Sequence, residues 1–210
     1  MSATIVIEGR EVRASKGASL LWTALDNGFF IPNLCSLKGI KRPFASCRLC
    51  YVEIAGRPGP VTACTEKVSD GLSVSLNSPA IARLRKTAFD LLLSNHRVDC
   101  GRCVKNGSCE LQKIAYREHF KLRDRRFPRI DMDFPLDASH PLFNFDRNKC
   151  VLCGRCVWVC QQKGKGILDF AYRGIKTVVS TFANVPLVES GCNSCRACVE
   201  VCPVGALYFK

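Results

Sequence analysis

The chain has 210 residues, of which 47% are hydrophobic, so general disorder is excluded. Its 31 Lys and Arg against 18 Asp and Glu give a net charge of +13, and its 15 cysteines, an odd number, exclude a fully paired disulfide scaffold. The start of the chain lacks the apolar stretch of a signal peptide and no segment is apolar enough to span a bilayer, so we expect a cytoplasmic protein without a membrane span, whose thiols bind metal.

Strand and turn patterns dominate the N-terminal region. Residues 4–15 predict a β-hairpin that turns at Glu8 and Gly9, and residues 19–27 predict a short helix that ends before Gly28. Two later segments, YVEI and GLSVSL, alternate between apolar and polar residues as strands do. A small domain with several strands and one helix is therefore expected here.

Four cysteines lie in the loops of this region, and they are Cys35, Cys47, Cys50 and Cys64. A hairpin, a helix and further strands with cysteine-bearing loops are typical of a β-grasp ferredoxin domain with a [2Fe–2S] cluster. The spacing C-x11-C-x2-C-x13-C departs from the plant-type C-x4-C-x2-C pattern.

A helix is expected to begin at Ser78 and Pro79, because proline is favoured in the first turn of a helix. Its predicted core stripe consists of Ile81, Leu84, Ala88, Leu91 and Leu92. Just past this helix stands His96, followed by three cysteines, Cys100, Cys103 and Cys109.

The segment that follows carries few signals. The basic run 121–126 is interpreted as a solvated face, because no aromatic interleaving or helix-turn-helix pattern supports nucleic-acid binding. Residues 126–143, rich in Pro and Asp, are expected to be a linker. His119 and His140 match no ligand pattern and are expected to be ordinary surface or core residues.

The last region repeats the motif C-x2-C-x2-C-x3-C, first at Cys150, Cys153, Cys156 and Cys160, then at Cys192, Cys195, Cys198 and Cys202. Pro203 follows the second copy, as in bacterial two-cluster ferredoxins, in which the fourth cysteine of each motif binds the other cluster. This rule assigns Cys150, Cys153, Cys156 and Cys202 to one [4Fe–4S] cluster, and Cys192, Cys195, Cys198 and Cys160 to a second. Gln161 stands where a proline is expected after the first copy, and residues 163–187 form an insertion that should be rich in strands.

The fifteen cysteines and His96 together form four groups of four candidate ligands, with no cysteine left over. Structural zinc is the alternative for C-x2-C pairs. Zinc sites, however, do not use three cysteines at successive two-residue gaps followed by a fourth three residues on. We therefore expect iron–sulfur clusters.

At this point the chain resembles a known family: the small diaphorase iron–sulfur subunit of NAD(P)-linked hydrogenases, bidirectional or electron-bifurcating, which is related to the N-terminal iron–sulfur region of the large subunit of NADH:quinone oxidoreductase. The resemblance rests on the motif IPNLC…ASCRLCYVEI…ACT and on H-x3-C-x2-C-x5-C followed by ELQ, and it covers essentially the whole chain. It implies that Cys35, Cys47, Cys50 and Cys64 hold [2Fe–2S]. It also implies a [4Fe–4S] cluster on His96, Cys100, Cys103 and Cys109.

The resemblance further implies that the chain relays single electrons between a flavin- and NAD(P)-binding partner subunit, which would carry FMN, and the small and large subunits of a hydrogenase. The same chain could instead serve an NAD-linked formate dehydrogenase, or act as a stand-alone polyferredoxin-like carrier. No glycine-rich nucleotide loop and no nucleophile motif is present, so catalysis by this chain itself is not predicted.

The expected architecture is α+β and has three modules. A β-grasp [2Fe–2S] domain covers residues 1–78, a mostly helical His–Cys [4Fe–4S] domain covers residues 79–140, and a ferredoxin-like domain with two [4Fe–4S] clusters covers residues 141–210.

Overall fold

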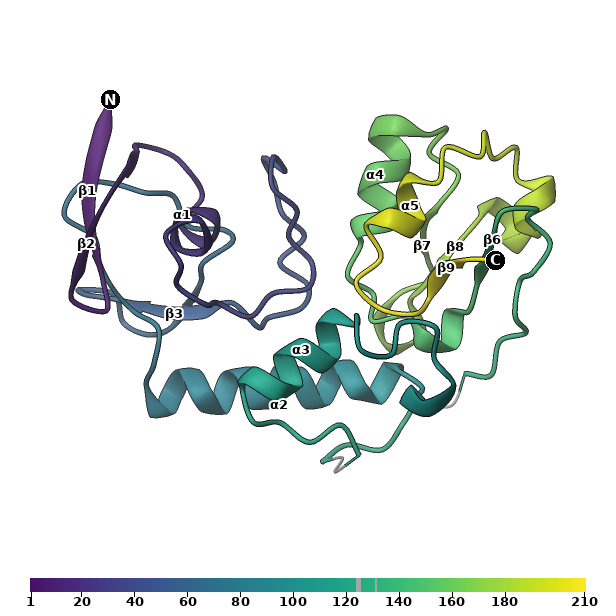
Figure 1. Cartoon of the computed structure of the whole chain (residues 1–210), viewed down its shortest axis with the longest axis horizontal. Helices are drawn as coiled ribbons and strands as arrows, with labels where there is room; N and C mark the ends of the chain where they lie inside the picture. Colours follow the sequence, from purple (N-terminus) through teal and green to yellow (C-terminus); the bar gives the residue numbers. More distant parts are fainter. Residues whose placement is uncertain (124–125, 131) are drawn as a thin grey trace. The chain divides into compact units, whose positions relative to one another are not determined.

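The computed structural model describes residues 1–123, 126–130 and 132–210. Asp124 and Arg125 of the basic run, and Asp131 of the expected linker, lie outside the described residues. The chain divides into two compact units, Met1–Phe89 and Asp90–Lys210, which contain the elements labelled in Figure 1. In the described part of the chain, no helix is long and apolar enough to cross a membrane.

The first unit is built on a five-stranded sheet with the strand order β2-β1-β5-β3-β4. Its strands are β1 (Ser2–Ile7), β2 (Arg10–Ser15), β3 (Tyr51–Ile54), β4 (Val61–Thr62) and β5 (Ser73–Ser75). The hairpin of β1 and β2 is antiparallel and turns at Glu8 and Gly9, as predicted, and both residues have a positive φ. β5 pairs with β1 in parallel and with β3 antiparallel. Both strands predicted from alternation are confirmed.

Helix α1 (Leu20–Asp26) supplies the helical part of this core. Its residues Leu20 and Leu21 are fully buried and belong to one apolar cluster with Ile5 and Ile7 of β1. Figure 1 shows α1 beside β1 and β2. The sequence LLWTALD therefore forms a helix whose apolar side is covered by the sheet.

Helix α2 (Pro79–Asn95) begins where the sequence predicted, and its first turn is capped because the Ser78 hydroxyl accepts from the backbone N–H of Ile81 at 3.2 Å. Phe89 and Leu93 are fully buried, whereas Leu91 is 51% exposed. The prediction that Leu91 belongs to the core stripe is therefore wrong. Leu91 lies two residues from each of these buried side chains, which places it on the opposite side of a helix with 3.6 residues per turn.

The second unit has less regular structure. Its helices are α3 (Glu110–Arg117), α4 (Arg155–Lys163) and α5 (Ala197–Glu200), and its strands are β6 (Phe143–Phe145), β7 (Asp169–Ala171), β8 (Val178–Ser180) and β9 (Leu207–Phe209). β6 pairs with β9 and β7 with β8, both antiparallel. The strands predicted in the insertion 163–187 are confirmed as β7 and β8. The described residues of this unit also form five short 3₁₀ turns: Cys100–Arg102, Arg147–Lys149, Gly174–Lys176, Phe182–Asn184 and Leu187–Glu189.

Candidate metal centres

The first group of thiols is buried in the first unit, and each of its members is at most 3% exposed: Cys35, Cys47, Cys50 and Cys64. Hydrogen bonds from the Cys47 and Cys64 thiols lower the pKa of Cys35 to about 2. Cys64 also donates to Cys50, which lowers the pKa of that thiol in turn. The four sulfur atoms are therefore gathered at one place.

The second group lines a pocket in the second unit, and its members are His96, Cys100, Cys103 and Cys109. His96 is 6% exposed, and its Nδ1 lies 2.8 Å from the carbonyl oxygen of Lys149. A carbonyl only accepts, so Nδ1 carries the proton and donates, and the lone pair of the neutral ring is on Nε2. This is the tautomer that presents Nε2 as a metal ligand.

Gly205, which lies near the C-terminus, lines the same pocket. A Cβ atom added to Gly205 would lie 2.6 Å from the sulfur of Cys103, so only glycine fits this position without a shift of its neighbours. Nearby, the backbone N–H of Glu110 donates to the carbonyl of Pro203 at 2.9 Å. The segment after Cys202 is therefore part of the wall of the His–Cys cavity.

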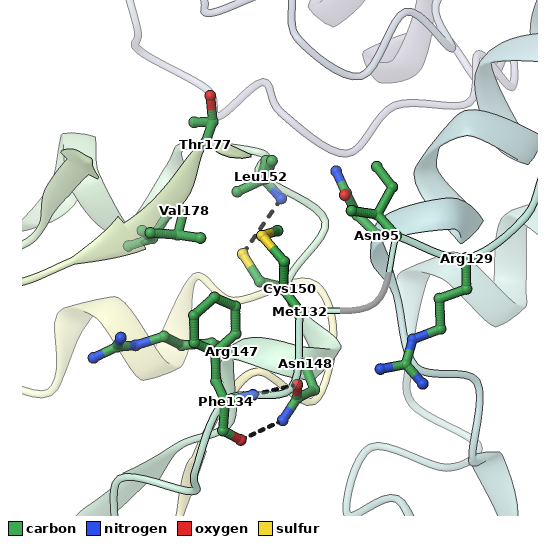
Figure 2. A pocket seen from close by; sticks show the side chains of 12 residues that line it. Asn95, Arg129, Met132, Phe134, Arg147, Asn148, Cys150, Leu152, Thr177 and Val178 are labelled. Carbon is green, nitrogen blue, oxygen red and sulfur yellow. Dashed lines mark hydrogen bonds between the residues drawn. The ribbon is translucent and has the colours of Figure 1, made fainter. Parts of the chain in front are cut away.

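A separate pocket is lined by Cys150, Cys153, Cys156 and Cys202. Cys202 thus lies with the first C-x2-C-x2-C motif and not only with its own. Burial, together with the nearby Cys202 sulfur, raises the pKa of Cys150 to about 12. Figure 2 shows the neighbouring pocket, in which the Asn148 side chain bonds twice to the backbone of Phe134 and the Leu152 N–H donates to the Cys150 sulfur.

The fourth group surrounds Cys198 at the start of α5. Burial, reinforced by the sulfurs of Cys160, Cys192 and Cys195, raises the pKa of Cys198 to about 12. Cys160 belongs to α4 and to the first motif, but it lies close to Cys198 of the second motif. In the same way, Cys202 of the second motif lies with the cysteines of the first. Cys195 is the exposed member of the group.

A repeated turn shapes both C-x2-C-x2-C loops. Leu152 and Ser194, each two residues after the first cysteine of its motif, have φ values of 52° and 57°, in the left-handed region. Each donates its backbone N–H to that cysteine's sulfur, at 3.3 Å for Leu152 to Cys150 and 3.4 Å for Ser194 to Cys192. Left-handed backbone at a residue other than glycine costs about 1 kcal/mol or more and clusters at functional sites. Backbone N–H groups turned toward one point form the anion-holding concavities found at Fe–S sites.

The donor set fits an iron–sulfur cluster. In the third and fourth groups, burial raises the pKa of Cys150, Cys153 and Cys198, so a bound cationic metal is what would stabilise their thiolates. Within the described residues, no group of three or more His, Cys, Asp or Glu side chains is placed to hold a metal ion. In the second and third groups the candidate ligands line a pocket, an arrangement that suits a multinuclear cluster with soft ligands better than one ion.

Three contributors to these sites have no signal in the sequence. They are the Lys149 carbonyl, the close approach of Gly205 and the buried ring of His140, whose Nε2 lies 3.1 Å from the Ser194 hydroxyl. His140 is a core residue, as one of the two expected alternatives had it, but the expectation did not include its contact with Ser194. His119 is exposed.

Three family models match successive parts of the chain. A 2Fe-2S iron-sulfur cluster binding domain matches residues 2–79, the NADH-ubiquinone oxidoreductase-G iron-sulfur binding region matches residues 85–121, and a 4Fe-4S dicluster domain matches residues 149–206. Binding domains for both cluster types are therefore present.

Similar proteins come from several organisms. NADP-reducing hydrogenase subunit HndD of Solidesulfovibrio fructosivorans is 36% identical over 97% of this chain, which spans only 35% of that relative. The subunit gamma of NAD-reducing hydrogenase HoxS of Cupriavidus necator is 32% identical, and the match covers the whole chain and 88% of that subunit. A crystal structure of NAD+-reducing [NiFe]-hydrogenase in the H2-reduced state matches with a TM-score of 0.89 and 31% identity, over 100% of this chain and 88% of the matched one.

Proposed function

Because this chain belongs to the family of the gamma subunit of NAD-reducing hydrogenases, we propose that it is an electron-transfer subunit. It relays single electrons between a flavin- and NAD(P)(H)-binding partner subunit and a hydrogenase catalytic module. The observation that carries this proposal is the separate gathering of all four predicted ligand groups within a chain of this family. Each cluster, when bound, supplies a one-electron carrier.

The assignment of ligands remains that of the sequence. Cys35, Cys47, Cys50 and Cys64 hold [2Fe–2S], and His96 with Cys100, Cys103 and Cys109 holds a [4Fe–4S] cluster. The exchange of fourth ligands in the last two groups is supported by the cavity that Cys202 lines with the first motif and by the electrostatic effect of Cys160 on Cys198. The four ligand groups follow one another along the chain, and most of their cysteines are buried, which keeps water away from the clusters.

The three modules are proposed with their predicted limits, 1–78, 79–140 and 141–210. The parallel pairing of β1 with β5, covered by α1, supports a β-grasp domain at the N-terminus. The packing of α4 against α5, each following a cysteine loop, supports a two-cluster ferredoxin-like domain at the C-terminus.

The partners follow from the family. A partner subunit binds FMN and NAD(P), and this chain exchanges electrons with the small and large subunits of the hydrogenase. We place the complex in the cytoplasm, where reducing conditions preserve fifteen thiols for metal. No nucleic-acid partner is proposed.

The first experiment is a count of iron, sulfide and zinc on the full chain purified without oxygen. The proposal requires about 14 iron and about 14 sulfide per chain, with negligible zinc. Substantial zinc, or a deficit of iron in the assembled complex, would remove at least one group from the relay.

The second experiment identifies the partners. A tagged chain purified from its native cells should bring down a flavoprotein and a hydrogenase in fixed proportion, and the complex should reduce NAD(P) with hydrogen. Reduction with formate instead would assign the chain to a formate dehydrogenase, and a chain that is always recovered alone would be a stand-alone carrier.

A further inference from the structure

His140 is held with one defined tautomer. It is 2% exposed, and its ring lies against Phe143, with 3.9 Å between ring centroids. The backbone N–H of Leu142 donates to Nδ1 at 3.2 Å, so Nδ1 keeps its lone pair and the proton of the neutral ring is on Nε2. Nε2 therefore donates to the hydroxyl of Ser194, 3.1 Å away and 54 residues further along the chain.

The segment that carries His140 is itself fixed on both sides. The Asp137 carboxylate accepts from the backbone N–H of Ser139 at 3.0 Å and from that of Leu187 at 2.9 Å. On the other side of His140, the carbonyl of Leu142 accepts from the backbone N–H of Lys210 at 3.1 Å. His140 is thus a rigid donor and not a side chain that follows the loop it contacts.

Ser194 is the residue that gives the Cys192–Cys195 loop its turn. Its left-handed backbone aims its N–H at the Cys192 sulfur, and that backbone conformation needs support from outside the loop. In the other motif, Leu152 takes the same conformation but packs its apolar side chain against the core of the unit. In the Cys192–Cys195 loop the corresponding residue, Ser194, is polar, and the residues around it are partly exposed. Its side chain is held instead by the hydrogen bond from His140.

We propose that His140 is a positioning residue for the fourth cluster site: through Ser194 it holds the loop in the form in which the Ser194 N–H donates to the Cys192 sulfur. The inference rests on the proposed function, because it requires a [4Fe–4S] cluster on this loop. Hydrogen bonds to cluster sulfurs stabilise the more negative, reduced state, so this contact raises the reduction potential of the site.

The test uses the full chain with its clusters, studied by redox titration with electron paramagnetic resonance. His140→Phe keeps an aromatic ring against Phe143 but removes the donor. One [4Fe–4S] signal should shift to lower potential, with iron content unchanged, and that iron should be lost faster to a chelator. His119→Phe, the same change at an exposed histidine, should shift nothing, and His140→Gln, which keeps an N–H donor, should recover part of the shift.

Ser194→Ala separates positioning from packing, because it removes only the acceptor. It should reproduce the shift of His140→Phe, and the double variant should shift no further than either single one, since both changes remove one contact. Unchanged potentials in Ser194→Ala, or additive shifts in the double variant, would overturn the proposal. If His140→Phe does not fold, Ser194→Ala decides alone.

A last variant distinguishes failure of this inference from failure of the proposed function. Cys195→Ala should remove the signal of the same cluster. If that variant keeps the iron content and all signals of the unaltered chain, the loop holds no cluster, and the ligand assignment is what fails. If the signal disappears in Cys195→Ala but does not shift in His140→Phe and Ser194→Ala, only the role of His140 fails.

Discussion

The two units of the chain obtain their cores in different ways. In the first unit, aliphatic side chains from a five-stranded sheet and α1 form a cluster in which Leu20, Leu21 and Ile5 are fully buried. In the second unit, the described residues form two sheets of two strands each, and the core cluster combines apolar side chains such as Phe143 and Leu207 with more cysteines than the first cluster holds, among them Cys156, Cys160 and Cys198. The first unit is a scaffold that carries a site. The second is arranged around the sites themselves, so its folding should depend on metal.

Removal of the metal should produce the largest difference in stability between the two units. After anaerobic chelation of iron, we expect the amide hydrogens of the second unit to exchange almost freely, because its cysteine loops lose the metal that holds them together. The strands β1, β2 and β3 should keep most of their protection. Hydrogen exchange followed by mass spectrometry measures both units in one sample, and equal loss in both would show that the first unit has no independent core.

A change in the scaffold should have the converse effect. Leu21→Ala removes a fully buried side chain from the first unit and should lower the free energy of unfolding of that unit by about 2–5 kcal/mol. The iron bound by the second unit should not change. Leu91→Ala, at a leucine of the second unit that is 51% exposed, is the control for the same change without burial and should cost less than about 0.5 kcal/mol.

In the second unit, a single added methyl group should damage a site. Gly205→Ala places a Cβ 2.6 Å from the Cys103 sulfur, and we expect a destabilisation of about 1–3 kcal/mol together with loss of iron from the His–Cys group. Gly101→Ala lies in the same group, where a Cβ meets no atom within 4 Å, and should retain the iron. Equal iron content in the two variants would contradict the close approach.

The smallest expected effect is on pH dependence. Burial, and next the positive charge of Lys210, lower the pKa of His140, against the opposing charge of Asp137. The folded state therefore favours the neutral ring. Its contribution to stability is complete above the ordinary pKa of 6.5 and falls as the pH drops below that value, because the unfolded chain takes up the proton first.

The check is thermal unfolding of the iron-loaded chain between about pH 7.5 and about pH 5.5. The decrease in unfolding temperature toward low pH should be smaller in His140→Phe than in the unaltered chain, and His119→Phe should behave like the unaltered chain. Identical pH dependence in all three would show that His140 does not titrate differently on folding.

The local elements were predictable where the pattern itself decides the structure. The hairpin at Glu8 and Gly9 and the capped start of α2 at Ser78 follow from turn and helix-end chemistry that acts within a few residues. The error at Leu91 has another origin. The neighbouring elements cover the side of α2 that carries Phe89 and Leu93, which is opposite Leu91, and the sequence does not say which side of a helix will be covered.

The amino-acid sequence alone determined which residues are the candidate ligands, because the spacing of Cys150, Cys153 and Cys156 and of their repeat is imposed by the shape of a cluster and not by the rest of the fold. Only the tertiary structure placed the Lys149 carbonyl on His96, Gly205 against Cys103 and His140 on Ser194. Each of these contacts joins residues more than 50 positions apart, and a backbone carbonyl, a missing side chain and a buried ring leave no spacing pattern for the sequence to show. The sequence pattern identifies the candidate ligands, whereas the contacts that orient them form only in the folded chain.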